Sequence, residues 1–203
     1  MKKIIFFNVP ITNEPEKLYF KAKGNASLQY DGKVKFAINA ILAKKVEKAD
    51  NIKIVMLKET QKKEYDKHYE KEFMIEFSKI NKSIGAKIKY VMLNKPHEEM
   101  RNAHEKLLNA MVNEIDDNSE IYADISFGTK PLPFLVFNIL TFAERFCNAK
   151  IGNIIYGKKD FSPTKQHEIY DLTSLYYLNS LSNTISCKDS KEAKTVFKKI
   201  LAI

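Results

Sequence analysis

Residues 120–136 read EIYADISFGTKPLPFLV, and the rest of the chain is organised around this stretch. Ile121 to Ile125 predicts a short strand with one acidic residue, Asp124, near its carboxyl end. The polar turn that follows is Ser126-Phe127-Gly128-Thr129-Lys130. We expect a helix to start at Pro131, where the missing N–H of proline costs nothing. The stretch therefore predicts a strand, a turn and a helix in direct succession.

The turn has two interpretations. Backbone N–H groups at a helix N-terminus favour a bound anion, and Lys130 would add a full positive charge. Ser126 and Thr129 would add two hydroxyl donors. In the alternative interpretation this is an ordinary turn in which Ser126 or Thr129 only caps the helix. The spacing of these residues does not decide between the two.

The remainder of the chain alternates between apolar strand patterns and helical patterns. Strands are expected at 3–8, 52–57, 88–93, 121–125, 151–156 and 167–170. Helices are expected at 34–46, 61–84, 97–115, 131–146, 171–182 and 189–202. Between the first strand and the first helix, Leu18 to Tyr30 suggests a small hairpin with a Gly24-Asn25 turn.

This alternation predicts an α/β, Rossmann-like fold with a mostly parallel central sheet flanked by helices and a short C-terminal helical appendage. We expect residues 1–185 to form one ligand-sensing domain. Residues 186–203 would form a C-terminal helix, which is either a dimer arm or the start of a linker. In sheets of this kind ligands bind beyond the carboxyl ends of the strands, near the switch point.

Composition limits the partners. The chain has 203 residues, is 44% hydrophobic and carries a net charge of +9. That balance suits a phosphate-bearing partner. Arg101 and Arg145 are the only arginines, so sequence-specific recognition of long nucleic acid is not expected. No apolar run is long enough to cross a bilayer. Cys147 and Cys187 match no metal spacing, and we expect reduced thiols in a cytoplasmic protein without a membrane partner.

Several common chemistries are excluded by their motifs. The stretch after the first strand is Asn8-Val9-Pro10-Ile11-Thr12, which lacks the glycines of a dinucleotide-binding site. No Walker A sequence occurs, and the four histidines show no metal-ligand spacing. Ser126 lacks the first glycine of a Gly-x-Ser-x-Gly elbow. We therefore expect neither a cofactor nor a metal.

The turn after the fourth long strand resembles the signature turn of CARF domains, the CRISPR-associated Rossmann-fold sensors of cyclic oligoadenylates. The nearest pattern is that of the subfamily with an Asp-x-Thr-His-Gly turn, a basic residue and Leu-Pro-Phe. The matching residues are Asp124, Gly128, Lys130, Leu132, Pro133 and Phe134. Ser126 replaces the threonine and Phe127 replaces the histidine, whereas Gly-Thr-Lys-Pro is similar to the Gly-Gly-Thr-Lys variant of sibling families. Tyr170-Asp171-Leu172-Thr173 also resembles a run of that subfamily.

The resemblance implies a protein of type III CRISPR antiviral defence that binds cyclic tetra- or hexa-adenylate across a homodimer. A ring of even order has two-fold symmetry, which a two-fold dimer matches. No signature of an attached effector ribonuclease is found, so we expect a stand-alone sensor or a sensory domain cut from a longer chain. The ligand-binding residues implied are Asn8, Val9, Thr12, Asn25, Ser27, Ser126, Phe127, Gly128, Thr129 and Lys130.

Two other functions remain open. The first is a metal-independent ring nuclease, in which each 2′-hydroxyl attacks its own 3′-phosphate and gives a 2′,3′-cyclic phosphate. Lys130 and Ser126 would then be the catalytic residues, with Lys130 stabilising the developing charge. The second is an α/β interaction module with no nucleotide ligand, in which the turn is only structural.

Overall fold

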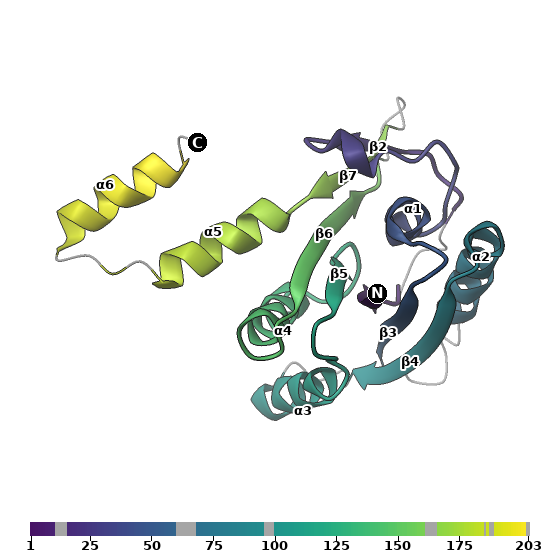
Figure 1. The fold of residues 1–203 in the computed structure, drawn as a ribbon, viewed down its shortest axis with the longest axis horizontal. Coiled ribbons are helices and arrows are strands. Elements are labelled where there is room, and N and C mark those ends of the chain that lie inside the picture. The colour runs from purple at the N-terminus through teal and green to yellow at the C-terminus, as the bar shows by residue number, and fades with distance from the viewer. Residues whose placement is uncertain are drawn as a thin grey trace.

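The structure is a computed structural model that describes residues 1–10, 16–59, 68–95, 100–160, 166–184, 186 and 189–201. Seven strands form one sheet (Figure 1). From edge to edge they are β2 (Phe20–Lys23), β7 (His167–Asp171), β6 (Lys150–Lys158), β5 (Glu120–Asp124), β1 (Lys2–Asn8), β3 (Asn51–Glu59) and β4 (Lys87–Lys95). The five strands from β6 to β4 are parallel, and β7 is antiparallel to β6. The predicted mostly parallel α/β, Rossmann-like fold is confirmed.

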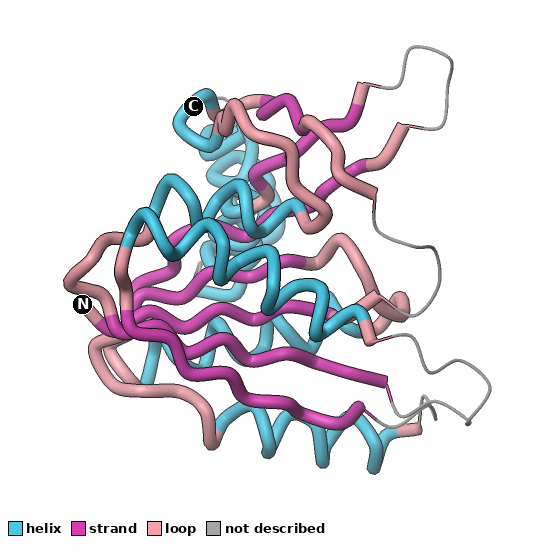
Figure 2. Tube along the Cα trace, turned by 90° about the vertical axis from the view of Figure 1, so that its right-hand side faces the viewer, coloured by secondary structure: helices cyan, strands magenta, loops and turns pink. Residues whose placement is uncertain are grey.

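Helices cover both faces of the sheet (Figure 2). One face packs against α1 (Ala37–Lys45) and α2 (Tyr69–Ile84), the other against α3 (Arg101–Val112) and α4 (Leu132–Phe146). Because successive strand side chains point to opposite faces, Ile5 and Phe7 enter the first core while Ile4 and Phe6 enter the second. A strand buried on both faces needs a continuous apolar run, and β1 has one.

The strand order places the topological switch point between β1 and β5. After β1 the chain forms β2 at the far edge and returns to form β3 and β4 on one side of β1, then crosses to β5 and β6 on the other side. The carboxyl ends of β1 and β5 are therefore neighbours from which the following segments diverge, which is where α/β sheets bind ligands.

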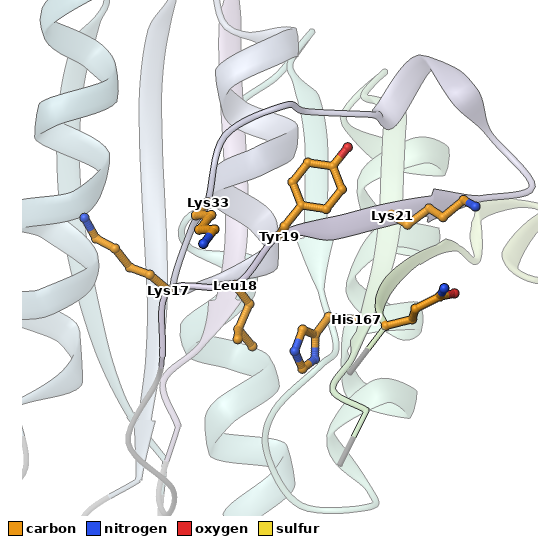
Figure 3. Close-up of a pocket in the computed structure, with 7 residues that line it drawn as sticks. Lys17, Leu18, Tyr19, Lys21, Lys33 and His167 are labelled. Carbon is orange, nitrogen blue, oxygen red and sulfur yellow. The ribbon is translucent and has the colours of Figure 1, made fainter. Parts of the chain in front are cut away.

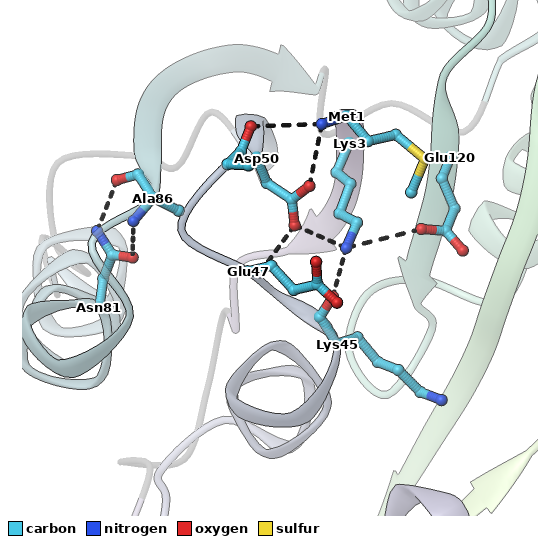
Figure 4. Close-up of polar contacts among 9 residues, drawn as sticks. Met1, Lys3, Lys45, Glu47, Asp50, Asn81, Ala86 and Glu120 are labelled. Atoms are coloured by element: carbon cyan, nitrogen blue, oxygen red, sulfur yellow. Dashed lines mark hydrogen bonds and ion pairs between the residues drawn. The ribbon is translucent and has the colours of Figure 1, made fainter.

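Buried ion pairs tie the strands together at the opposite, amino end (Figure 4). The Lys3 ammonium lies 2.7 Å from Asp50 and 3.8 Å from Glu120, and it also donates to the carbonyl of Lys45. Burial alone would raise the pKa of Asp50, but hydrogen bonds from Lys3 and from the N–H of Glu47 hold that pKa below its ordinary value. Since these charges satisfy one another, this end of the sheet is structural.

The hairpin expected between Leu18 and Tyr30 is wrong. β2 pairs in parallel with β7, the short 3-10 helix η1 (Ala26–Leu28) follows, and Leu18 forms an isolated bridge with Val34. Of that prediction only the turn at Gly24 is correct, since Gly24 has a φ of +75°. Phe20 and Leu28 are buried in the first core, so packing and the free edge of β7 determine the pairing of this segment.

Two helices, α5 (Thr173–Thr184) and α6 (Ser190–Leu201), follow β7 and project beyond the sheet (Figure 1). Tyr176 anchors α5, since it is fully buried and its hydroxyl donates to Glu144 of α4 at 2.8 Å. α6 buries none of its described side chains. The helical appendage agrees with the predicted fold class, whereas the domain boundary at residue 185 stays a prediction. No helix in the described part of the chain has the length and apolar character needed to cross a membrane.

Glu76 of α2 supplies the N-terminal cap that α1 lacks. Its carboxylate accepts hydrogen bonds from the N–H groups of Lys35 and Phe36 at 2.8 and 3.3 Å, and from the amide of Asn39 at 2.8 Å. Phe36, at the N-cap position, cannot cap the helix with its own side chain. The start of α1 is therefore held by a neighbouring helix.

We predict that Glu76→Ala lowers the free energy of unfolding by roughly 2–3 kcal/mol, because it leaves several partly buried donors without their charged acceptor. Urea denaturation measures this loss. Lys79→Ala, an exposed position on the same helix, is the control and should stay within about 0.5 kcal/mol of the parent protein. Equal losses in the two variants would show that Glu76 does not cap α1.

Candidate functional site

The turn from Ser126 to Lys130 lies at the carboxyl ends of β1 and β5, at the switch point of the sheet. Asn8 ends β1, and Asp124 ends β5 opposite Phe7. α4 begins at Leu132, directly after the turn. The strand, turn and helix predicted from residues 120–136 are all present. The helix starts one residue after the expected Pro131, which occupies the N-cap position.

Asp124 anchors the first half of the turn. It is 1% exposed, and its Oδ1 accepts a hydrogen bond from the N–H of Ser126 at 2.8 Å. Its Oδ2 has no hydrogen-bond partner among the described residues. Burial raises the pKa of this carboxyl to about 6, although hydrogen bonds from Ser126 and from the N–H of Ile38 oppose the rise. A buried carboxyl whose pKa lies about one unit below neutral pH is therefore directly beneath the turn.

Ser126 connects the turn to the next strand. Its Oγ accepts a hydrogen bond from the N–H of Gly157 on β6 at 2.7 Å. A Cβ added at Gly157 would lie 2.6 Å from the Cβ of Ala37 and 3.1 Å from this Oγ. Glycine is thus required where β6, the turn and the start of α1 meet. The hydroxyl of Ser126 is used inside the protein.

Gly128 allows the turn to close over Asn8. Its φ is +108°, and a Cβ there would lie 2.6 Å from the Cδ2 of Leu132 and 3.7 Å from the Cγ of Asn8. Asn8 is 2% exposed, and its amide donates to the carbonyl of Asp124 at 3.3 Å. Its Oδ1 has no partner in the part of the chain that the structure describes. Asn8 therefore supports the turn from below.

The second half of the turn offers unused donors. The backbone N–H groups of Phe127, Gly128 and Lys130 have no acceptor within the described residues. Lys130 is exposed, and its ammonium has no acidic partner there either. α4 has no acidic residue in its first turn and no side-chain cap at Pro131. By contrast, Glu76 occupies the N-terminus of α1. The N-terminus of α4 thus keeps its positive potential.

Four further residues were predicted for the site, namely Val9, Thr12, Phe127 and Thr129. Val9 is buried, and its N–H donates to the carbonyl of Leu57 at 3.0 Å. Phe127 is half-buried against the first core. Thr129 accepts the N–H of Leu132 at its carbonyl, at 3.1 Å. Thr12 lies outside the described residues.

Asn25 and Ser27 are held apart from the turn. The amide of Asn25 donates to Asp171 at 2.6 Å, and its Oδ1 accepts from the N–H and the hydroxyl of Ser27. Asp171 also binds Asn153 of β6 at 3.0 Å. Asn153 precedes Gly157 by four positions, which is about 13 Å along a strand. The structure therefore brings Asn8 and residues 126–130 together, and it does not bring Asn25 or Ser27 to them.

The Tyr170-Asp171-Leu172-Thr173 run has a structural explanation. The Oδ1 of Asp171 accepts from the N–H and the hydroxyl of Thr173 at 3.0 and 2.5 Å, so it caps the start of α5. Its Oδ2 binds Asn25 and Asn153. One carboxylate thus joins β6, β7, η1 and α5. Sequence reasoning missed this role, and it also missed Gly157, for which a glycine inside a strand was the available signal.

No arrangement of metal ligands is found among the described residues. Cys147 is a free thiol, and Cys187 lies outside the described residues.

Comparison with known proteins gives one partial similarity. No family model matches the chain. Over 74 residues it is 30% identical to CRISPR-associated protein MJ1674 of Methanocaldococcus jannaschii. The match covers 36% of this chain and 12% of that protein, so the similarity concerns a small part of a much longer relative.

We predict that Asp124→Asn raises the free energy of unfolding at about pH 8 by roughly 2–3 kcal/mol, because the variant no longer buries a charge. The folded-state pKa of about 6 lies above the ordinary value of 3.8. The folded protein therefore binds more protons than the unfolded chain between these values, and the stability of the parent protein falls as the pH rises through them.

Urea denaturation over a pH series tests this prediction. The difference between parent and variant should vanish below about pH 3, where residue 124 is uncharged in the folded and unfolded states of both proteins. Asp31→Asn changes an exposed carboxylate and serves as the control. A difference that is the same at every pH would contradict the assignment of a titrating, buried carboxyl.

Proposed function

We propose that this chain is a CARF-type sensor that binds a cyclic oligoadenylate across a homodimer and acts in CRISPR-based antiviral defence. The observation that carries the proposal is the set of free donors at the switch point. Three unused backbone N–H groups and the unpaired ammonium of Lys130 surround the uncapped N-terminus of α4. This arrangement suits a phosphodiester oxygen.

Two further findings support the same function. The partial relative is named a CRISPR-associated protein. Asp124, Gly128 and Lys130, which carry the resemblance to CARF domains, each have a distinct place in the turn. Asp124 fixes the first N–H, Gly128 provides the positive φ, and Lys130 stays exposed. A fold match by itself would not identify a ligand.

Exposed apolar side chains on α4 and the two C-terminal helices support the homodimer. Phe134 and Phe146 of α4 are each 72% exposed. Further large apolar residues that are exposed on α5 and α6 are Leu175, Tyr177, Leu181, Phe197 and Leu201. Surfaces of this kind mark association sites. A two-fold axis near α4 would present the same turn twice to a symmetric ring.

We therefore expect a two-chain particle in sedimentation velocity, and we expect Phe134→Asp to shift it toward monomer by placing a charge in the contact. Lys106→Asp, an exposed position on α3, reverses a charge away from this surface and should leave the dimer intact. A parent protein that stays monomeric with and without cyclic tetra-adenylate would refute the two-fold site.

Ring cleavage is the second candidate function, and the unpaired state of Lys130 favours it. A ribose 2′-oxygen of the bound ring would attack the adjacent phosphorus while its proton leaves. The bond from phosphorus to the 5′-oxygen of the next nucleotide would break, leaving a 2′,3′-cyclic phosphate and a 5′-hydroxyl. Negative charge grows on the phosphoryl oxygens during this step, where the Lys130 ammonium could stabilise it.

We predict that Lys130→Ala weakens the binding of cyclic tetra- or hexa-adenylate by about tenfold to a hundredfold, because one charge-assisted contact to phosphate contributes roughly 1.5–3 kcal/mol. Calorimetric titration measures the affinity, and chromatography of the ligand after incubation measures cleavage. If the protein cleaves, the rate at saturating ligand should fall beyond what the loss of binding explains.

Lys106→Ala removes an equal charge from α3 and is the control. Ser126→Ala should change affinity less than Lys130→Ala, since its hydroxyl is bonded to Gly157. If Lys130→Ala binds as tightly as the parent, the turn is not the phosphate site. If the parent binds the ring but never yields product, it is a sensor only.

A further inference from the structure

A basic concavity lies at the β2–β7 edge of the sheet (Figure 3). Its volume is about 410 Å³, within the range of small-molecule sites. Its lining residues are Lys17, Leu18, Tyr19, Lys21, Lys33, Gln166 and His167. β7 is two strands from β5, or about 10 Å across the sheet. None of the lining residues belongs to the turn.

The three lysines of this concavity form no ion pair with the described residues. Lys17, Lys21 and Lys33 are exposed and have no ion pair or hydrogen bond among the described residues. Among the described residues no carboxylate lines the concavity. By contrast, Lys3, Lys23, Lys35, Lys53 and Lys58 are each paired with an acid, as Lys23 is with Glu168 at 3.1 Å. The nearby carboxylate of Asp160 accepts the N–H of Gln166 at 3.2 Å.

Two ring side chains of the lining are held in fixed orientations. The hydroxyl of Tyr19 accepts a hydrogen bond from Gln29 at 2.8 Å, while the residue stays 44% exposed. The Nδ1 of His167 accepts the N–H of Asp160 at 3.1 Å. In the neutral ring the proton is then on Nε2, which becomes a donor. Nε2 has no partner among the residues that the structure describes.

From these contacts we infer that the concavity formed by Lys17, Tyr19, Lys21, Lys33 and His167 is a binding site for a phosphorylated nucleotide, either free or at the end of an oligonucleotide. Figure 3 shows Lys17 and Lys21 extending to opposite sides, so their flexible side chains would turn inward to bind the phosphate together with the Nε2–H of His167, and the exposed Tyr19 ring would stack on the base. Lysine charge combined with aromatic stacking is a common way to bind a nucleotide without reading its sequence. The inference does not depend on the function proposed for the turn.

Calorimetric titration of the whole chain with adenosine 5′-monophosphate tests this site. Three variants are compared with the parent. The first is Lys17→Ala/Lys21→Ala/Lys33→Ala, which removes the charge of the concavity. The second is Lys44→Ala/Lys48→Ala/Lys106→Ala, which removes three exposed lysines elsewhere and matches the first in net charge. The third is Lys130→Ala, which removes the charge of the turn.

We expect the first variant to lose at least about tenfold in affinity, and the other two to stay within about twofold of the parent. Tyr19→Leu should weaken binding of the nucleotide but not of inorganic phosphate, because it removes only the stacking surface. A linear tri-adenylate that binds more tightly than the mononucleotide would identify the end of an oligonucleotide as the ligand. Equal affinities would identify the free nucleotide.

Three outcomes would overturn the inference. The first is that the parent binds the nucleotide no more tightly than inorganic phosphate. The second is that the two triple variants lose affinity equally, which would show a general effect of net charge. The third is that only Lys130→Ala loses affinity, which would place the nucleotide at the turn.

Discussion

The burial of Asp124 at the end of β5 is the constraint on which the candidate site depends. An ionised carboxyl in the core is costly unless it accepts hydrogen bonds. Here the N–H of Ser126 and the start of α1 provide them, and the pKa still rises to about 6. Satisfying this carboxyl bends the chain into a turn directly after the strand. The N–H groups of Phe127, Gly128 and Lys130, later in the turn, have no acceptor among the described residues.

Direct contacts connect the turn to the sheet, through β6, and to the helical layer formed by α1 and α2. Ser126 is bonded to Gly157 of β6, and Gly157 packs against Ala37 at the start of α1. Glu76 of α2 fixes that same end of α1. The orientation of the turn therefore depends on side chains from three other elements. An exposed loop with unused donors is stable here because its base is rigid.

The sequence predicted the parts of this arrangement that are local. Ile4 to Phe7 and Ile121 to Ala123 are continuous apolar runs, and runs of this kind predict strands buried on both faces. The proline and glycine of the turn predicted its place, whereas the φ of +108° at Gly128 comes from the structure. The pairing of β2 with β7 was not predictable, because it joins residues 20–23 to residues 167–170 across most of the chain. The predicted hairpin rested on local signals alone. The burial of Phe20 in the first core instead favours the pairing of β2 with β7.

The difference between local and long-range contacts also explains which residues of the candidate site could be predicted. Lys130 was identified from the local pattern of a turn before a helix start, and Asn8 was implied by the resemblance to CARF domains. The positions of Asn25 and Ser27 depend on Asp171, which is far away in the sequence. The net charge of +9 indicated a phosphate-bearing partner. Only the structure distinguishes lysines that pair with acids, such as Lys35 with Glu72, from those that are free to meet a ligand.

The central claim is that residues 126–130 are the anion site. Amide hydrogen exchange followed by mass spectrometry, with and without cyclic tetra-adenylate, tests it most directly. The account predicts that the ligand slows exchange at Phe127, Gly128 and Lys130, whose N–H groups have no acceptor among the described residues. Residues 51–53, at the amino end of β3 and opposite Lys2 to Ile4, should be unchanged. Binding that leaves the turn unprotected, or that protects only other segments, would contradict it.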